Sequence, residues 1–434
     1  MQSPTSEAPA RDLELADLHD STMYPSAEVM FFLLGSSRTR AGEFHSELAS
    51  IISSDSFERM AFALIDEQIL GHARAEYIVC VNFFSLTLTI GLESGDVSSS
   101  FRRRLKPLQK KYRRNAFAAL NHISMLSTPS LSLLQALLAG AMLFQMAGNT
   151  GKCAQLSAAA CLICSHLGGR FFAELAKGTS KQESLEARQC LGHCYILDKS
   201  LSMSLGRRSF LPDMDVNASM LIPPTLEMPS TPIFNVYIEF AKVQDGVALE
   251  ARASSSRSPR RRVHAIQLLC HRLERIRAKI ESFRSQPPHS TDHLLQGEWM
   301  GVDFTYYSIM TAIIRLHPDF STDQSVRESC LNNARISLHA LRRMELHGLE
   351  SHGNHNAYCH SVSWIVLLYP LCSIFALFCH VVETSEKQDL QLLHDVTQGL
   401  SMFAEFNKSI VRVRDWCSIL VLLGKSCTDD FENA

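Results

Sequence analysis

One helix with an acidic residue on its apolar side constrains the fold of this chain more than any other feature. Apolar residues recur there at steps of three and four, so they line one face of a helix: Leu191, Cys194, Leu201 and Leu205. Gly206 follows directly and is placed to end this helix as its C-cap. Asp198 lies on the same stripe, so its carboxylate is expected to point at the core. The fold must therefore supply that carboxylate with a partner.

The nearest candidate partners of Asp198 are two arginines just past the end of the helix. A guanidinium can form two hydrogen bonds with one carboxylate, so Arg207 and Arg208 both suit this role. We interpret the contact as a buried structural ion pair rather than a catalytic group, because structural networks also perturb carboxylates.

The residues around this helix carry a family resemblance. Tyr-Ile-Leu-Asp at 195–198, Leu-Gly-Arg at 205–207 and Pro-Asp-Met-Asp at 212–215 resemble the signature of the fungal-specific transcription factor domain. This domain is also called the middle homology region of the binuclear zinc-cluster regulators. The resemblance implies an all-helical regulatory domain in a nuclear protein. It places the structural signature on Asp198, Gly206, Arg207, Asp213 and Asp215.

A predicted helix hairpin precedes the signature helix and is similar to another segment of the family. Ser127-Thr128-Pro129 forms a helix start, Gly148 a turn, and Gly168-Gly169 the end of the second helix. The chain departs from the family pattern at Leu162, where the family usually has arginine, and at Gly192, where it usually has tryptophan. These departures predict altered or looser packing around the signature helix.

Length and composition favour one large helical domain. The chain has 434 residues, of which 46% are hydrophobic, so it can bury a sizeable core. We predict an all-α fold, a large multi-helix bundle of packed antiparallel helices. The expected parts are a disordered acidic tail (1–28), the regulatory domain (29–425, with its signature region at 131–215 and a C-terminal helical part at 260–425) and an acidic tail (426–434).

A basic run stands out from a chain whose formal net charge is only -2. That net charge argues against nucleic-acid binding through overall charge. The run contains Arg102, Arg103, Arg104, Lys106, Lys110, Lys111, Arg113 and Arg114. A solvated helix face and phosphate contact are alternatives, but a nuclear localisation signal is the favoured functional interpretation, because no aromatic residues or base-reading fold accompany the run. Pro107 argues against one uninterrupted helix here.

Two apolar segments leave alternatives open. Residues 266–283 carry apolar residues at alternating steps of three and four, which predicts either packing inside the bundle or a dimer seam; we favour the former because the run is short. Residues 362–382 contain no formal charge and are long enough to span a bilayer. Pro370 and the resemblance to soluble family helices favour a buried core segment, and we expect no membrane partner.

The cysteines and histidines predict no metal site. The 13 cysteines are scattered and are typical of a reducing compartment. His352, His355, Cys359 and His360 are zinc-ligand types, but they sit in a polar loop, and Cys161 and Cys164 lack a second pair. Family regulators read DNA through six closely spaced N-terminal cysteines, and this chain has none before Cys80. No cofactor is expected, and zinc would be implied only by a missing N-terminal cluster.

The resemblance implies a nuclear transcriptional regulator of a metabolic or secondary-metabolite pathway. The expected partners are the transcription machinery or co-regulator proteins, with a homodimer as an open alternative. DNA would be reached only through a missing module or a partner. We expect no enzyme, because the chain has no nucleophile elbow, phosphate loop, metalloprotease motif or dinucleotide fingerprint. The alternative is a helical enzyme or scaffold protein recruited to a biosynthetic pathway.

Overall fold

A computed structural model describes residues 18, 20–39, 51–92, 99–124, 126–176, 182–211, 230–253, 257–287, 293–350, 355–404 and 407–432. Within these ranges the chain is 86% helical, with fifteen α-helices and no strand. The predicted all-α class is confirmed.

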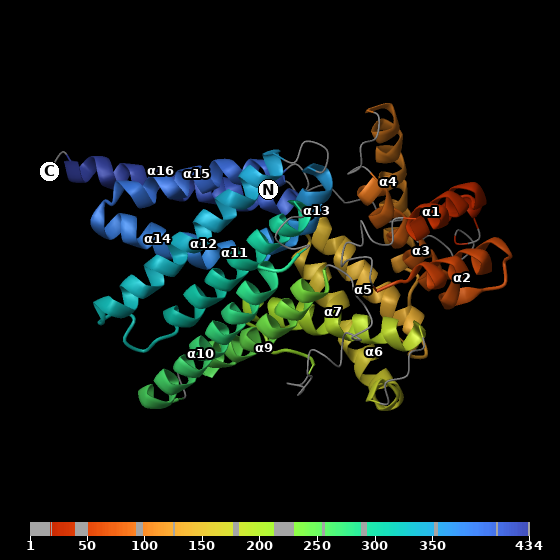
Figure 1. Cartoon of the computed structure of the whole chain (residues 1–434), viewed down its shortest axis with the longest axis horizontal. Coiled ribbons are helices and arrows are strands. Elements are labelled where there is room, and N and C mark those ends of the chain that lie inside the picture. Colours follow the sequence, from red (N-terminus) through yellow and green to blue (C-terminus); the bar gives the residue numbers. More distant parts are fainter. Residues whose placement is uncertain are drawn as a thin grey trace, which may run out of the picture.

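The helices divide into two groups along the chain. The N-terminal group comprises a 3₁₀ turn, η2 (Ser21–Met23), and α1 (Ala27–Thr39), α2 (Ser54–Ile65), α3 (Gly71–Leu92), α4 (Ser99–Leu120), α5 (Leu131–Met146), α6 (Thr150–Ala176) and α7 (Gln182–Leu205). The C-terminal group comprises α9 (Thr231–Ala253), α10 (Pro259–Arg284), α11 (His293–Arg315), α12 (Gln324–Glu350), α13 (His355–Leu368), α14 (Pro370–Thr384), α15 (Lys387–Ala404) and α16 (Lys408–Glu432). Figure 1 shows α1–α4 at one end and the long helices α9–α16 at the other.

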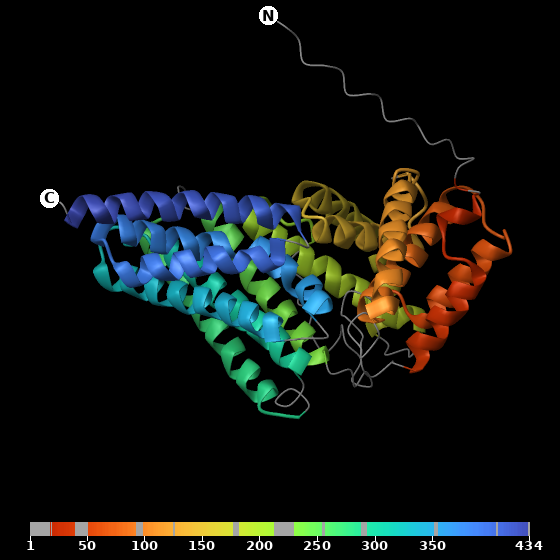
Figure 2. The same ribbon diagram turned by 90° about the horizontal axis from the view of Figure 1, so that it is seen from above.

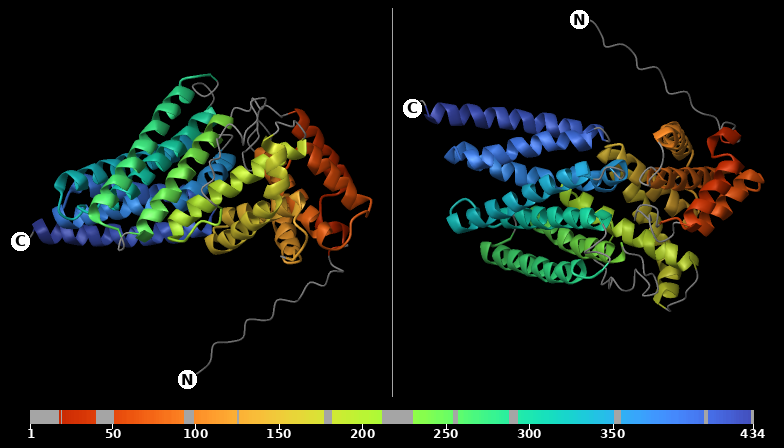
Figure 3. Two further views of the ribbon diagram at one scale, coloured as in Figure 1. Left: turned by 90° about the horizontal axis from the view of Figure 1, so that it is seen from below. Right: turned by 45° about the horizontal axis from the view of Figure 1, so that its top comes forward.

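Helices that follow one another in the chain pack as neighbours, as α3 does on α4, α5 on α6, α11 on α12 and α15 on α16. Helix α7 contacts α5 and α6 on one side and α9 and α13 on the other. It therefore joins the two groups of helices, and Figure 3 shows it between them. The predicted signature helix is thus central to the packing.

Local signals set most of the helix ends. Gly206 has φ +64° and ends α7, and Gly148 has φ +76° and turns the chain between α5 and α6, as predicted. Helix α5 begins later than expected, because Ser130 rather than Ser127 is its N-cap: the Ser130 hydroxyl accepts a hydrogen bond from the N–H of Leu133 at 3.1 Å. The expected end of α6 at Gly168 is wrong, since the helix continues to Ala176.

Helix α4 runs without interruption through Pro107, contrary to the sequence-based expectation. Leu105, Tyr112 and Ala116 on this helix are buried, and α4 packs against α3. Tertiary packing on both sides of the proline therefore outweighs the lost backbone hydrogen bond, which is a cost of ~3 kcal/mol in a helix interior.

Parts of the two segments that the sequence suggests are tails lie within the described residues. Within the expected acidic tail at 1–28, Leu18 and Tyr24 are buried and Asp20 caps η2. At the other end, α16 extends to Glu432, so residues 426–432 continue the helix instead of forming a separate tail.

The seam at residues 266–283 packs inside the molecule, which confirms the favoured interpretation. Ile266, Leu269, Leu273, Ile276 and Ile280 of α10 are buried, and α10 packs on α9 and α11. The 2.5 Å separation between a Cβ built on Gly246 and Leu269 Cδ2 shows how closely α9 approaches this seam.

The segment at 362–382 is not a straight helix. It is divided into α13 and α14, which are bent by 49° at the break that contains Tyr369 and Pro370. Among the described helices, α3 alone is long and apolar enough by composition to cross a membrane, and 83% of its most apolar window is buried inside the fold. A core helix that packs on all sides has the same composition.

Candidate functional site

The candidate site is a buried polar cluster at the C-terminal end of α7. Helix α7 carries Asp198, which is fully buried, and Gly206 then turns the chain so that residues 207–211 fold back beside the helix. Asp213 and Asp215, the other predicted signature positions, lie outside the described residues.

Asp198 binds the returning chain with both of its carboxylate oxygens. Its Oδ1 lies 3.2 Å from Nη1 of Arg207, so the predicted contact is present. Its Oδ2 accepts hydrogen bonds from the backbone N–H groups of Phe210 at 2.8 Å and Leu211 at 2.9 Å. The expected two-pronged arginine contact does not form, because the second oxygen is used by these N–H groups. Asp198 therefore caps a turn as well as pairing with a cation.

Arg207 is partly exposed, with 21% of its side chain open to solvent. Its Nη1 also donates to the carbonyl oxygen of Arg208 at 2.9 Å, and its guanidinium lies 4.6 Å from the centre of the Phe210 ring. Its Nε and Nη2 are buried and have no hydrogen-bond partner within the described part of the chain. Arg208, the second candidate partner, is exposed and contributes only its backbone carbonyl to the cluster.

A second ion pair, which sequence reasoning missed, lies beside the first. Lys199 is fully buried, and its Nζ is 3.1 Å from Oδ1 of Asp245 on α9. The same Nζ donates to the carbonyl oxygen of Leu211 at 2.7 Å and to Oγ of Ser209 at 3.1 Å, and Ser209 donates to Asp245 at 2.7 Å. Lys199 is 100° around the helix from Asp198, so helical periodicity gives no reason to bury both. The returning chain and α9 together cover the lysine.

Helix α9 also holds the start of the returning segment, because Nη1 of Arg252 donates to the carbonyl oxygen of Arg207 at 2.5 Å. The segment is thus attached to α9 at two places, through Asp245 and through Arg252. No local sequence pattern predicts these two contacts, because α9 begins 25 residues after Gly206 in the chain.

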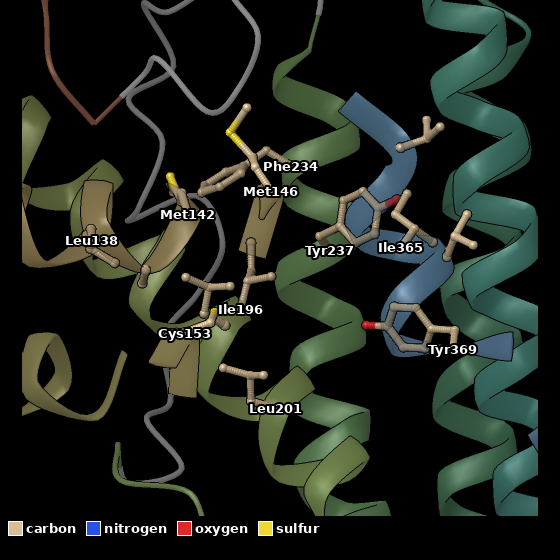
Figure 4. Packing of buried hydrophobic residues seen from close by; sticks show 14 of the residues in the cluster. Leu138, Met142, Met146, Cys153, Ile196, Leu201, Phe234, Tyr237, Ile365 and Tyr369 are labelled. Carbon is tan, nitrogen blue, oxygen red and sulfur yellow. The ribbon is translucent and has the colours of Figure 1, made fainter. Parts of the chain in front are cut away.

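A buried hydrogen-bonded triad links α7 to the C-terminal helices. The Ser200 hydroxyl donates to Oε1 of Gln244 at 3.0 Å, Nε2 of Gln244 donates to the Tyr369 hydroxyl at 2.5 Å, and Tyr369 donates to Ser200 at 3.1 Å. Burial raises the pKa of Tyr369 to about 12. Figure 4 shows Tyr369 and Ile365 facing α9, with Ile196 and Leu201 of α7 beyond it.

The apolar packing around α7 accommodates the glycine at position 192. A Cβ built there would lie 2.7 Å from Cζ of Phe234, so the phenylalanine of α9 occupies the space that a larger residue would need. His193 packs beside the same ring, with centroids 4.9 Å apart. The packing at Gly192 is therefore close rather than loose. Leu162, the other departure from the family pattern, is 51% exposed.

The opposite end of α7 carries another buried acid that sequence reasoning missed. Glu186 is fully buried and accepts hydrogen bonds from the N–H of Ser53 at 2.9 Å, from Oγ of Ser56 at 2.8 Å and from Nε2 of Gln135 at 3.1 Å. Ser53 is the N-cap of α2, so the carboxylate lies where a helix N-terminus favours negative charge. Helix α7 therefore anchors α2 at one end and α9 and α14 at the other.

The predicted nuclear localisation run lies on α4, at the end of the molecule that α1–α4 form (Figures 1 and 2). Arg103, Arg104, Lys106, Lys110 and Arg114 are exposed, and Lys111 and Arg113 are half-buried. Burial lowers the pKa of Arg113. Within the described residues none of these seven side chains forms an ion pair with a carboxylate. The side chain of Arg102 lies outside the description.

No group of three or more metal-ligand side chains in the described ranges is arranged to hold a metal ion. Of the four zinc-ligand types noted near residue 355, His352 lies outside these ranges and Cys359 is buried. Cys161 and Cys164 are buried on α6 and lie beside Cys194 of α7, where burial raises the pKa of the Cys194 thiol. Buried free cysteines of this kind pack as small apolar core residues.

In the polar cluster itself the charged groups are largely bonded to one another, so the arrangement serves to fix a turn and to connect helices. The fungal specific transcription factor domain matches residues 93–344, which is more than half of the chain and includes α7, the cluster and α9. No zinc-cluster family matches it. No curated protein matches the chain in sequence. The chain therefore belongs to the family of fungal-specific transcription factor domains.

Proposed function

We propose that this protein is a transcriptional regulator of a metabolic or secondary-metabolite pathway, and that the α7 cluster transmits its control. Family membership supports a fungal transcription regulator. The observation that carries the mechanism is the position of α7, whose buried acids Glu186 and Asp198 hold α2 at one end and the returning segment at the other. A shift of α7 would change both ends of the molecule together.

Arg207 is the point at which an effector or partner would act on the cluster. Its side chain is 21% exposed, while its Nε and Nη2 are buried and have no hydrogen-bond partner within the described part of the fold. An acidic group that reached the exposed part of the Arg207 side chain would compete with Asp198 for the guanidinium. Because Asp198 also holds the N–H groups of Phe210 and Leu211, such competition would alter the returning segment and its attachment to α9.

The experiment that tests regulation uses the full chain fused to a heterologous DNA-binding domain, with a reporter gene that carries the matching site. A regulator that works through the transcription machinery or co-regulators changes reporter output, and Arg207→Ala changes that output without reducing the amount of folded protein. Reporter output equal to that of the DNA-binding domain alone would count against the proposal. A deletion strain with altered metabolites but an unaltered transcriptome would instead favour a biosynthetic enzyme or scaffold.

For nuclear entry, the exposed arginines and lysines of α4 are the proposed signal. A fluorescent fusion carrying Arg103→Gln, Arg104→Gln and Lys106→Gln is expected to shift from the nucleus to the cytoplasm. The matched control carries Arg260→Gln, Arg261→Gln and Arg272→Gln on α10. These arginines are also exposed, and their substitution removes the same number of positive charges. Loss of nuclear signal in both variants would show that overall charge, not α4, directs import.

A further inference from the structure

Ser258 lies where the chain passes from α9 to α10, and its hydroxyl has no capping role. It is the exposed N-cap residue of α10, yet its side chain makes no capping hydrogen bond. The hydroxyls of Ser53 and Ser130, by contrast, cap α2 and α5. The backbone of Ser258 is extended, with φ -65° and ψ 148°, because the proline that follows disfavours a helical residue before it. Ser258 is thus an exposed hydroxyl residue in an extended conformation.

The residues that follow Ser258 set it apart from the other serines and threonines of the chain. Those that directly precede a proline are Ser3, Thr128, Thr231 and Ser258. Ser258 alone among them has arginines after its proline, at positions 260–262. Arg260 and Arg261 are exposed. The sequence and the exposure together single out this segment.

A kinase that accepts proline directly after the serine would select this segment. Proline has a fixed φ and no N–H group, so it suits a substrate groove that offers no acceptor at that position, where any other residue would leave its N–H unsatisfied. Carboxylates further along such a groove would bind the guanidinium groups of Arg260 and Arg261. The chemistry of the segment therefore indicates a proline-directed kinase that also recognises basic residues.

We propose that Ser258 is a phosphorylation site of such a proline-directed serine/threonine kinase, with Mg²⁺-bound ATP as the phosphoryl donor. The Ser258 Oγ attacks the γ-phosphorus of ATP, the new Oγ–P bond forms as the bond to the ADP oxygen breaks, and ADP leaves. The hydroxyl proton passes to the aspartate base of the kinase.

The first turn of α10 must open to admit the kinase, because a substrate binds in the kinase groove as an extended chain. Residues 259–261 then leave the helix. The bonds that are lost begin with the one from the N–H of Arg262 to the carbonyl oxygen of Ser258, at 3.1 Å. Helix ends fray, and each such bond contributes little net stability because water replaces the lost partner. Beyond this turn the helix stays attached, since Nη2 of Arg262 donates to the carbonyl oxygen of Leu316 at 2.7 Å.

The phosphate gains partners once the turn closes again. A phosphoserine carries a charge of about -1.5 to -2 at pH 7 and three acceptor oxygens. At the N-cap it lies at the positive end of the helix dipole, where the N–H groups of Arg260 and Arg261 precede the first intrahelical bond. The side chains of these arginines add two positive charges. Phosphorylation therefore stabilises the helical form of this turn.

A third arginine changes its partner. In the unmodified chain, Nη1 of Arg257 contacts Oε1 of Glu250 near the end of α9, and the Glu250 side chain is only 7% exposed. Arg257 directly precedes Ser258, so the phosphate competes with this carboxylate for the guanidinium. Two residues after Glu250, Arg252 holds the carbonyl oxygen of Arg207. Phosphorylation thus alters the end of α9 that holds the returning segment.

Incubation of the purified full chain with a cyclin-dependent kinase, Mg²⁺ and ATP tests the site. Phosphopeptide mapping by mass spectrometry is expected to place the phosphoryl group on Ser258. Ser258→Ala should lose it and keep the Tm of the wild type, because no capping bond is removed. The matched control is Thr128→Ala, which removes an exposed hydroxyl before a proline that no arginine follows, and it should incorporate as much phosphate as the wild type. Absence of phosphate on Ser258, or equal incorporation on Thr128, overturns the proposal.

Thermal melts of the phosphorylated chain test the change of partner by Arg257. Glu250→Gln removes the negative charge that competes with the phosphate, so phosphorylation should raise the Tm more in this variant than in the wild type. Glu274→Gln on α10 is the matched control, because this exposed acid lies beside His271 instead, and its shift should equal that of the wild type. Equal shifts in all three proteins would overturn the change of partner. Every readout uses the purified protein, so the outcome is independent of the proposed role in transcription.

Discussion

Asp198 and Arg207 contact each other through one pair of atoms, Oδ1 and Nη1 at 3.2 Å, while the other carboxylate oxygen holds two backbone N–H groups. Asp198 therefore contributes more to the free energy of unfolding than its ion pair with Arg207 alone. If the ion pair were the whole interaction, either partner could be removed with a similar effect. The geometry predicts that the two residues contribute unequally.

We expect Asp198→Ala to lower the free energy of unfolding by about 3 kcal/mol, because it leaves the N–H groups of Phe210 and Leu211 buried without an acceptor. Arg207→Ala should lower it by only about 1 kcal/mol, since Asp198 keeps both N–H donors. The exchange Asp198→Arg with Arg207→Asp should not recover stability, because arginine accepts no hydrogen bond. Urea denaturation measures all three, and recovery in the exchanged variant would show that the ion pair dominates.

Lys199 and Asp245 should behave as a coupled pair. Removing the buried ammonium with Lys199→Met leaves Asp245 without its cation and should lower the free energy of unfolding by about 3 kcal/mol. Adding Asp245→Leu should recover a large part of that loss, since two apolar side chains of similar volume can replace a buried pair. A double-mutant cycle in urea reports the coupling, and additive losses would contradict it.

Replacing Gly192 with alanine should destabilise the protein even though alanine favours helix formation. The new Cβ would lie 2.7 Å from the Phe234 ring, and such overpacking costs about 1–3 kcal/mol, which exceeds the helical gain of about 1 kcal/mol. Gly151→Ala on α6 is the matched control, because its Cβ would meet only Asn149 Oδ1 at an ordinary 3.7 Å. Thermal melts should show a lower Tm for Gly192→Ala and an equal or higher Tm for the control. Equal effects at both sites would mean that Phe234 moves aside freely.

Tyr369 should make the protein less stable at high pH. Its pKa is about 12 in the fold and near 10 in an unfolded chain, so between these values the unfolded state has lost the proton that the folded state still holds. The free energy of unfolding must therefore be fully maintained below pH 10 and fall as pH rises toward 12.

The measurement for Tyr369 is urea denaturation from pH 9 to 11.5 with Tyr369→Phe as the comparison. Tyr112 and Tyr306 also have pKa values of about 12, so both the wild type and the variant should show the contribution of these two residues to the pH dependence. The free energy of unfolding of the variant should fall less steeply with pH than that of the wild type, by a slope that corresponds to about one proton. Identical slopes in the two proteins would show that Tyr369 ionises normally in the fold.

The sequence by itself determined features that depend on neighbours along the chain. The spacing of apolar residues at three- and four-residue steps predicted that Asp198 lies on the core-facing side of α7. The same spacing predicted that Ile266 and Leu273 lie on the core-facing side of α10. Gly206 ended its helix because a left-handed residue is needed there. These are properties of one helix and its cap, so a single stretch of sequence is sufficient to read them.

Only the tertiary structure decided where the buried polar groups find their partners. Lys199 meets Asp245, and Glu186 meets Ser53, across 46 and 133 residues of chain respectively, and helical periodicity carries no information over such separations. The uninterrupted course of α4 through Pro107 has the same origin, since contacts with α3 offset a local penalty. A buried charge is tolerated only where distant elements converge on it, and that convergence is a property of the packed fold.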